Sequence, residues 1–470
     1  MLLAYLFVLL CSTTTSPLYL SNPYWHHGDS GIFQEMGLVI AHGGVPYVDV
    51  FDHKGPVLFF IQALGLMINE YWGIFVLQGI SLSVTLWIWY KMISLSPKNI
   101  WIKFGILFIA LLFLFGYCER GNLCEEWSLP YISISIYQFL KHWSDGMRLS
   151  GKEWFVVGLC TCTIIFIRAN NIAPILGFAI YSISIEVVSK EKVVLQHMLM
   201  GLFGCVLVAG FWIFFFLFYY GKDALSWMIY GSFLFNFEYI QKGRSVGTWY
   251  DILYYVSILG FVILTISATL RRRDYPILTI LISYAVTTLA IGNNKFVHYQ
   301  IIFIPLFVVT MIMTSKIRWH YVLLLGVVIA QALYIGKSEA DVVLVRLLKD
   351  THVRASMVDF ERFLSSLPKE EKSDIYDYYA FPSSYFAEEK LVHRNRCVME
   401  THARHSQRLQ DIERQDGLIV KQPTWVLTSS NCLQINSVDY DYIRANYIIA
   451  DSVVGYDGLG FVYCYKKIKR

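Results

Sequence analysis

The stretch that decides the fold is residues 26–56, HHGDSGIFQEMGLVIAHGGVPYVDVFDHKGP, which closely follows the first apolar segment. It contains four acids, four histidines and one lysine, whereas the rest of the first 335 residues is overwhelmingly apolar. Acidic side chains beside a lipid bilayer cost free energy unless they are solvated, paired or used in function. This polar loop is therefore the first candidate for a functional site.

The composition around the loop is typical of a protein that crosses a membrane many times. The 470 residues are 56% apolar and 16% charged, whereas soluble domains contain about 25% charged residues. The 32 Phe, 32 Tyr and 13 Trp fit aromatic belts at the membrane interfaces. A net charge of +4 gives no indication of nucleic-acid binding. The nine cysteines form no CxxC pair, so neither a zinc site nor a disulfide framework is predicted.

Apolar segments of suitable length predict eleven membrane spans. A helix needs about 20 apolar residues to cross the hydrocarbon core. One further apolar run, 56–69, begins at Pro56 and has fourteen residues, so we expect an interfacial or re-entrant helix there. The predicted spans are 2–20, 72–93, 101–117, 127–140, 154–167, 172–188, 198–220, 251–270, 276–291, 300–314 and 319–335.

The distribution of Lys and Arg predicts the orientation of these spans, because cytoplasmic loops carry an excess of both. With the N-terminus inside and 56–69 not counted as a span, the cytoplasmic connections carry thirteen basic residues and the outer ones seven. Counting 56–69 as a span would place Arg271, Arg272 and Arg273 outside. We therefore predict that the polar loop faces outward.

The apolar pattern stops near Gly336, which divides the chain into two predicted domains. Residues 1–335 are expected to form an all-α polytopic membrane domain, with juxtamembrane helices in a catalytic outer loop, 21–71. Residues 336–470 are expected to form a small soluble α/β domain on the outer side. Within it the sequence predicts helices at 339–366 and 402–414 and strands at 374–379, 424–427, 447–449 and 460–465.

Asp29 and Lys54 are the leading functional candidates in the loop. The Asp29 carboxylate can act as a general base on an alcohol or bind a metal, and it can also cap a helix that starts at Gly31. Lys54 follows His53 and precedes Gly55-Pro56. A lysine there can extend to lipid headgroups or contact a phosphate. The positive-inside rule does not favour an outer lysine, which gives weight to the phosphate contact.

Further charged and aromatic residues are predicted on the same outer side. Glu125 and Glu126 lie between the third and fourth spans, where adjacent carboxylates can share a metal or divide acid and base roles. A solvated loop would have the same sequence, so this point stays open. The connection 221–248 is interpreted as a lid. The other residues that either line a polar pocket or extend to headgroups are Arg168, Arg244, His298 and Tyr299.

The order and spacing of these residues resemble those of the GT-C superfamily of polytopic glycosyltransferases. The similarity is to the branch of bacterial protein mannosyltransferases and the lipid A aminoarabinose transferase. That branch has an acid early in the first outer loop and a Lys-(Gly/Pro)-Pro-Leu-Leu motif opening a juxtamembrane helix; Asp29 and Lys54-Gly55-Pro56-Val57-Leu58 match these positions. Glu125-Glu126 matches the second acid, and His298-Tyr299 resembles a late-span motif. Ser30 and the paired glutamates depart from the usual acids, which leaves metal use open.

The resemblance implies spans plus juxtamembrane helices and a sugar donor on a polyprenyl phosphate, with transfer and inversion outside the cytoplasmic membrane. The acceptor would be a hydroxyl on a cell-envelope glycan, lipid or protein, and no nucleotide is needed. Lys54 would stabilise the leaving phosphate and Asp29 would act as base, with Glu125 or Glu126 as second acid. A divalent cation, if used, would bind Asp29 and Glu126. The expected substrate-binding residues are His53, Lys54, Arg168, Arg244, His298 and Tyr299.

Two other classes of protein share parts of this pattern. A lipid-linked glycan flippase or transporter would place ionisable residues near the bilayer midplane and contain internal repeats. The sequence instead groups its charges at one face and shows no repeat. A polysaccharide polymerase or ligase would use a diphosphate-linked donor on the same face, and the sequence leaves this alternative open.

Overall fold

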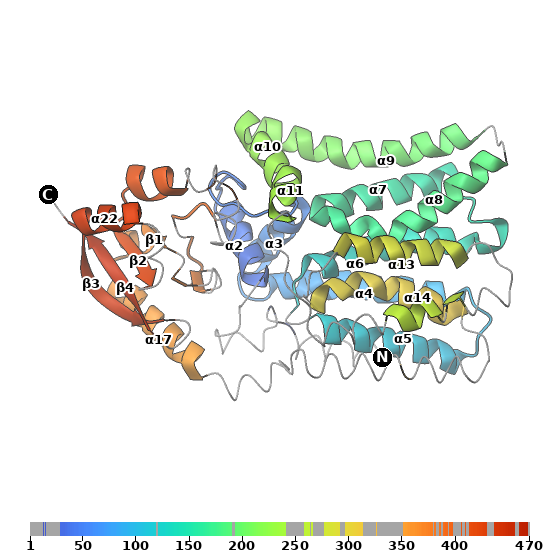
Figure 1. Cartoon of the computed structure of the whole chain (residues 1–470), viewed down its shortest axis with the longest axis horizontal. Coiled ribbons are helices and arrows are strands. Elements are labelled where there is room, and N and C mark those ends of the chain that lie inside the picture. The colour runs from blue at the N-terminus through green and yellow to red at the C-terminus, as the bar shows by residue number, and fades with distance from the viewer. Residues whose placement is uncertain are drawn as a thin grey trace. The chain divides into compact units, whose positions relative to one another are not determined.

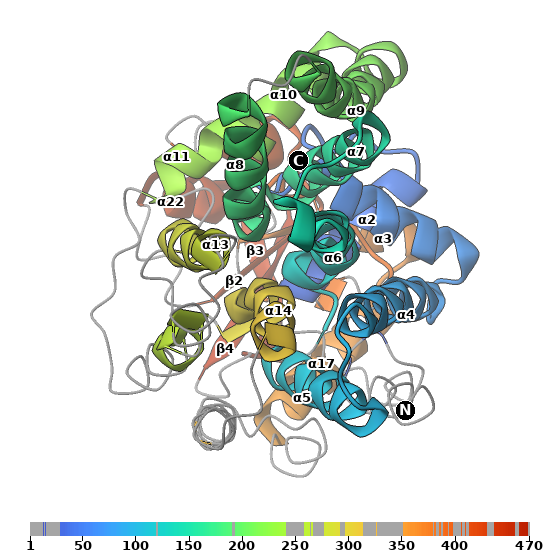
Figure 2. The same cartoon turned by 90° about the vertical axis from the view of Figure 1, so that its right-hand side faces the viewer.

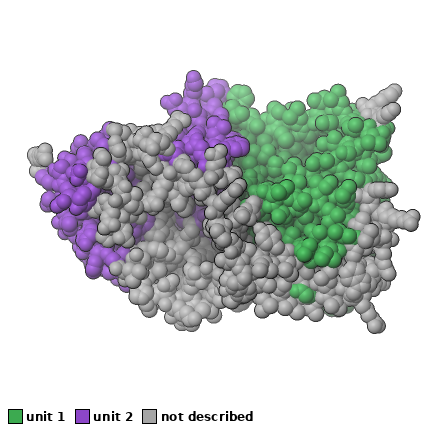
Figure 3. All heavy atoms as spheres, viewed as in Figure 1, with its two compact units in different colours: residues 1–13, 76–215, 244–342 green, residues 14–75, 216–243, 343–470 purple. Residues whose placement is uncertain are grey.

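The computed structural model describes two compact units, each built from separated segments of the chain. Unit 1 comprises Met1–Thr13, Val76–Phe215 and Arg244–Val342; unit 2 comprises Thr14–Phe75, Phe216–Gly243 and Val343–Arg470 (Figure 3). The residues described are 13, 15, 29–118, 121–189, 193–240, 258–263, 265–266, 277–291, 297–313, 326, 351–378, 380–381, 385–386, 389–392, 394–397, 406, 409, 413–429, 437–455 and 460–468.

Unit 1 is a bundle of apolar helices that lie lengthwise beside one another (Figure 1) and are seen nearly end-on in Figure 2. Four described segments are long and apolar enough to cross a membrane: Gly73–Ser94, Ile100–Tyr117, Gly151–Val188 and Val194–Tyr220. The chain is therefore a multi-pass membrane protein. The helices are α4 (Gly73–Ser94), α5 (Ile100–Tyr117), α6 (Cys124–Lys141), α7 (Gly151–Arg168), α8 (Ala173–Val188), α9 (Val194–Phe215), α13 (Ile277–Ile291) and α14 (Ile304–Met313).

The bounds of these helices follow the predicted spans closely wherever the chain is described. The span expected at 300–314 is divided into a 3-10 segment, Val297–Phe303, and α14. The span at 198–220 starts a turn earlier and ends in a π-helical segment, Phe216–Tyr220. The predicted spans 2–20, 319–335 and most of 251–270 lie outside the described residues.

Glycines allow the helices of unit 1 to pack closely. A Cβ atom on Gly158 of α7 would lie 2.0 Å from the carbonyl oxygen of Gly201 on α9. Gly204 of α9 is equally restricted, because its Cβ would lie 2.4 Å from the Phe155 carbonyl oxygen. In lipid the hydrophobic effect does not drive helices together, so close packing of small residues contributes more of their association. This packing holds α7, which ends at Arg168, in a fixed place in the bundle.

The first two segments of unit 2 contain the short helices α2 (Asp29–Ala41), α3 (Pro56–Ile68), α10 (Lys222–Ile229) and α11 (Phe235–Ile240). At thirteen residues, α3 is as short as its sequence predicts. It packs against α2, where a Cβ on Gly37 would lie 2.6 Å from the Gln62 Cβ. The connection 221–248, interpreted from sequence as a lid, is helical in its described part, because apolar side chains at regular spacing are buried there.

A four-stranded sheet forms the rest of unit 2, with strand order β1-β2-β4-β3. The strands are β1 (Ile375–Asp377), β2 (Trp425–Ser429), β3 (Tyr447–Val454) and β4 (Phe461–Lys467). β1 pairs parallel to β2, and the other pairs are antiparallel. All four strands overlap the predicted ones, although β3 continues to Val454, beyond its predicted end at residue 449.

Helices cover both faces of this sheet. Side chains alternate along β2, so that Leu427 joins one core with Phe363 of α17 (Thr351–Ser366). Its neighbour Val426 joins the other core with Ile443 of α22 (Ser437–Asn446). α17 is the described part of the helix predicted at 339–366, whereas α22 was not predicted. The helix predicted at 402–414 lies almost wholly outside the described residues, which resume with a π-helical segment, Glu413–Val420.

Candidate functional site

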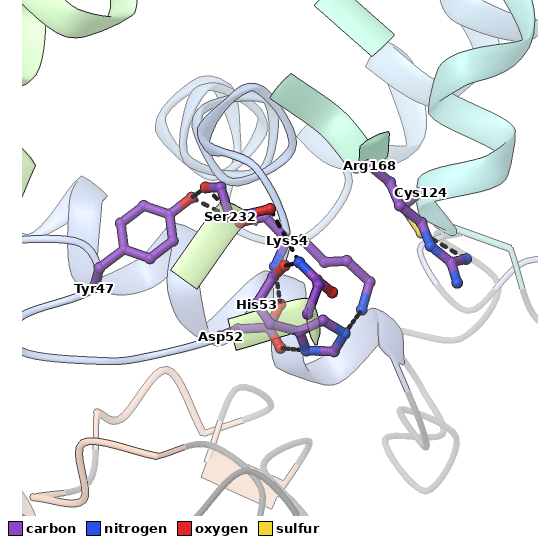
Figure 4. Close-up of polar contacts among 8 residues, drawn as sticks. Tyr47, Asp52, His53, Lys54, Cys124, Arg168 and Ser232 are labelled. Atoms are coloured by element: carbon purple, nitrogen blue, oxygen red, sulfur yellow. Dashed lines mark hydrogen bonds and ion pairs between the residues drawn. The ribbon is translucent and has the colours of Figure 1, made fainter. Parts of the chain in front are cut away.

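Tyr47 is the structural centre of the polar loop. Its side chain is fully buried, with ring centroids 5.6 Å from Phe59 and 6.0 Å from Phe216. Its backbone has φ 67°, a left-handed conformation that is uncommon for a bulky residue. The hydroxyl donates a hydrogen bond of 2.8 Å to the carbonyl oxygen of Lys54 (Figure 4). Burial raises the pKa of Tyr47 well above its ordinary value, so the phenol keeps the proton that it donates.

Asp52, His53 and Lys54 form a polar cluster directly before α3. His53 Nδ1 lies 3.4 Å from Asp52 Oδ1, and His53 Nε2 lies 2.8 Å from Lys54 Nζ. An ammonium group only donates, so Nε2 accepts and the imidazole proton is assigned to Nδ1, facing Asp52. Lys54 is 7% exposed. The nearly buried Lys54 Nζ therefore lies beside the His53 ring, whose other nitrogen faces the Asp52 carboxyl group (Figure 4).

A segment of unit 2 that is distant in sequence binds the main chain of His53 and Lys54. Asn236 Nδ2 donates to the His53 carbonyl oxygen at 3.2 Å, and Ser232 Oγ donates to the Lys54 carbonyl oxygen at 3.4 Å. The Ser232 hydroxyl also lies 3.3 Å from the Tyr47 hydroxyl. Three side chains thus hold two consecutive carbonyl groups. Sequence reasoning singled out Lys54 and His53 but missed Tyr47, Ser232 and Asn236.

A second cluster, in unit 1, joins residues from three helical segments. Arg168, at the end of α7, forms an ion pair with Glu125, in the first turn of α6. The guanidinium carbon lies 4.2 Å from the ring centroid of Tyr299, a cation–π distance. Cys124 Sγ donates to Glu125 Oε2 at 3.1 Å. His298 is buried, with its ring centroid 4.7 Å from that of Tyr299.

The two adjacent glutamates have different partners. Glu126 Oε1 accepts a 2.7 Å hydrogen bond from Gln78 of α4, and its Oε2 accepts one from the Leu123 N–H at the start of α6. Glu126 therefore caps α6 and joins it to α4, whereas Glu125 is the carboxylate that holds Arg168. Glu125, Arg168 and Tyr299 meet as expected for residues on one side of the membrane. By contrast, Lys141, from a predicted cytoplasmic connection, contacts Glu153.

Asp29 and Arg244 are the remaining candidates from the sequence. Asp29 is the first residue of α2 and is half-buried, which suits the positive end of the helix dipole. Arg244 lies outside the described residues. Within the described part of the chain, no group of three His, Cys, Asp or Glu side chains is arranged to hold a metal ion. Asp29 and Lys54 belong to unit 2, and the Glu125 cluster belongs to unit 1.

Apolar spanning helices, short helices around the first polar loop and a small sheet make up the fold of this membrane protein. The structure is similar to crystal structures of ArnT from Cupriavidus metallidurans. The apo form gives a TM-score of 0.63 at 12% identity, covering 98% of this chain and 96% of that one. The form bound to undecaprenyl phosphate gives 0.62 at 12% identity, covering 99% and 97%. The resemblance predicted from the sequence, whose specific motif covers residues 25–60, is thereby confirmed at the level of the fold.

Comparison of the sequence itself adds no closer relative. No protein-family model matches the chain, and no curated protein matches it. At 12% identity, the likeness to ArnT establishes the fold alone.

The Glu125–Arg168 pair yields a prediction about stability. Glu125 is fully buried and the Arg168 side chain is 18% exposed, so Arg168→Gln leaves an uncompensated buried carboxylate. We expect a loss of about 3–5 kcal/mol in the free energy of unfolding, measured with denaturant in detergent micelles. The double variant Glu125→Gln/Arg168→Gln removes both charges and should recover most of this loss.

Lys141→Gln serves as the control for this experiment. It breaks the pair between Lys141 and Glu153, whose side chains are 30% and 17% exposed, respectively. The free energy of unfolding should fall by about 1 kcal/mol or less. Equal stability of Arg168→Gln and the double variant would contradict the assignment of Arg168 as the partner of Glu125.

Proposed function

We propose that this chain is a glycosyltransferase that moves a single sugar from a polyprenyl-phosphate donor to an acceptor hydroxyl on the outer face of the cytoplasmic membrane. The observation that supports it best is the likeness to ArnT over nearly the full length of both chains, including a form of ArnT bound to undecaprenyl phosphate. The donor sugar can be a hexose or a pentose, and the acceptor a cell-envelope glycan, lipid or protein.

Lys54 is the proposed ligand of the donor phosphate. Its ammonium group is held by His53 at the start of α3, where the positive end of the helix dipole also favours an anion. As the sugar leaves, negative charge grows on the phosphate, and a preorganised cation stabilises it. The other end of α3 exposes Leu64, Met67 and Ile68, which suits contact with lipid or with the polyprenyl chain.

Asp29 is the proposed base. The acceptor oxygen attacks the anomeric carbon, the bond from that carbon to the phosphate oxygen breaks, and the acceptor proton passes to the Asp29 carboxylate. The carrier leaves as polyprenyl phosphate, and direct attack inverts the anomeric centre. Glu125, with Arg168, Tyr299 and His298, is the proposed second acidic group, because Glu126 is used in capping α6. Arg244 is a further proposed substrate-binding residue.

The assay for this function uses purified protein and a panel of polyprenyl-phosphate sugars, scored for release of the free phosphate carrier. Turnover with a monophosphate-linked single sugar supports the proposal. Turnover with only a diphosphate-linked glycan would identify a polymerase or ligase. Movement of a lipid-linked glycan across liposomes without chemistry would identify a flippase.

The topology proposed with this function has eleven spans, with residues 21–71 and the domain 336–470 outside. Single cysteines at His42 and Lys421, both exposed, should react with an impermeant reagent added outside. A cysteine at the exposed Lys152 should react only from the cytoplasmic side. The background would have its native cysteines replaced. Labelling of position 42 or 421 from the cytoplasmic side alone would refute this orientation.

Asp29→Asn keeps the size of the side chain and removes its charge. We expect turnover to fall by at least about 100-fold, the usual scale of general-base catalysis, while the thermal unfolding temperature stays near that of the parent. Glu70→Gln changes an exposed carboxylate at the far end of α3 and should leave turnover unchanged. Near-normal turnover of Asp29→Asn would show that Asp29 stabilises α2 and does not act as the base.

Lys54→Gln should weaken donor binding and slow turnover together, because the lost charge faces the leaving group. Lys54→Arg should be intermediate, since the charge is kept and the shape changes. The KM for the acceptor should change little in both. Lys222→Gln, at an exposed lysine of unit 2, is the control. Parental donor affinity in Lys54→Gln would move the phosphate site to Arg168 or Arg244.

A further inference from the structure

We propose that Arg396, 342 residues beyond Lys54 in the chain, is a positioning residue for Lys54, so that donor binding depends on the C-terminal part of unit 2. The inference rests on the proposed function, because it takes Lys54 as the ligand of the donor phosphate. It adds a role for a segment, Arg394–Cys397, that the sequence did not single out.

Arg396 holds the polar loop through both its main chain and its side chain. Its carbonyl oxygen accepts a 2.5 Å hydrogen bond from the Phe51 N–H, and Cys397 forms a parallel β-bridge with Phe51. Its Nη2 donates to the Tyr47 carbonyl oxygen at 3.0 Å. Tyr47, Phe51 and Cys397 are all buried. A single residue therefore fixes two points of the loop, four residues apart.

The guanidinium group of Arg396 is itself held in place. It lies 3.9 Å from the ring centroid of Trp227 in α10, at a distance that gives a cation–π contact. Trp227 packs edge-on against Phe51, with ring centroids 6.1 Å apart. Phe51, Cys397 and Leu409 share a small core with Tyr230 and Phe235. This core lies between the C-terminal segment and the helices that carry Ser232 and Asn236.

The segment 394–397 is in turn anchored to the sheet. The Arg394 N–H donates to the Ile375 carbonyl oxygen at 2.8 Å. Asn395 exchanges two hydrogen bonds with the main chain of Asp377, accepting from its N–H at 2.8 Å and donating to its carbonyl oxygen. Asn395 therefore binds the main chain of β1 through its side chain. These bonds fix the position of the neighbouring residue, Arg396, relative to the sheet.

From Arg396 the contacts continue to Lys54 through Tyr47. Arg396 binds the main chain of Tyr47, and the Tyr47 hydroxyl binds the main chain of Lys54 at 2.8 Å. The left-handed backbone of Tyr47 needs support from its surroundings to persist. Loss of the Arg396 contact should allow Tyr47 to relax, which frees the Lys54 carbonyl and turns the ammonium away from its place beside His53.

The test measures the Kd for undecaprenyl phosphate and the KM values for donor and acceptor in the full-length protein. Arg396→Gln should raise the Kd and the donor KM about tenfold, the scale of one lost charge-assisted hydrogen bond, with the acceptor KM unchanged. Arg396→Lys should recover part of the affinity, because it keeps a donor and a cation over Trp227. Tyr47→Phe removes only the hydroxyl and should act in the same direction with the packing retained.

Arg362→Gln is the matched control. Arg362 lies in α17, pairs with Asp359 and Asp451, and its side chain is 50% exposed. Both of these partners lie outside the polar loop, so its loss should leave the Kd unchanged. A merely structural role for Arg396 would lower the unfolding temperature of Arg396→Gln while the folded protein bound the carrier normally, and that result would overturn the inference.

A double-variant cycle separates positioning from direct binding. If Arg396 acts through Lys54, adding Arg396→Gln to Lys54→Gln should change the Kd less than twofold, because the effects are not additive. Equal effects in both backgrounds would overturn the inference. One outcome would refute only this inference: the parent binds the carrier and Lys54→Gln does not bind it, while Arg396→Gln and Tyr47→Phe both bind it as tightly as the parent. If the parent does not bind the carrier, the proposed function itself fails.

Discussion

A carboxylate shielded from water must have a partner, and three buried glutamates of this protein meet that requirement in different ways. Glu125 is paired with Arg168, and Glu126 accepts from Gln78 and from the start of its own helix. Glu186 of α8 accepts hydrogen bonds from Trp154 and His197. Apart from the bond between Glu126 and the start of its own helix, each contact joins residues from different helices. The polar pairs therefore fix how the apolar helices are placed relative to one another, which apolar contacts alone would not specify.

The sequence predicted the long elements well because their signals are local. Hydrophobic length sets the ends of α4, α5, α7 and α8, and alternation along β2 reports its two buried faces. Helix α22 escaped prediction because Asp439, Asp441 and Arg444 interrupt its apolar spacing. The eleven-span topology and the two-domain division stay predictions, since several of the expected spans lie outside the described residues.

The candidate site was only partly predictable, and the reason is sequence separation. Lys54 and His53 could be found because they interrupt an apolar pattern. Ser232, Asn236 and Arg396 act on that loop from segments more than 170 residues away, and no local pattern marks them. Glu125 and Glu126 could not be separated either. Glu126 stands three residues after the cap position of α6, but Leu123 there replaces the Ser or Thr that usually marks this arrangement.

The interleaving of the two units bears on how the chain is made. Phe51 pairs with residues 396 and 397, which emerge from the ribosome 345 residues later. At about 5–20 residues per second, the loop waits roughly 20 to 70 seconds for its partner. Throughout that interval its aromatic side chains lack the core formed with Cys397 and Leu409. Insertion of most spans is thus complete before the loop can reach its final form, so a nascent chain truncated before residue 396 is expected to be membrane-embedded but unable to complete this loop.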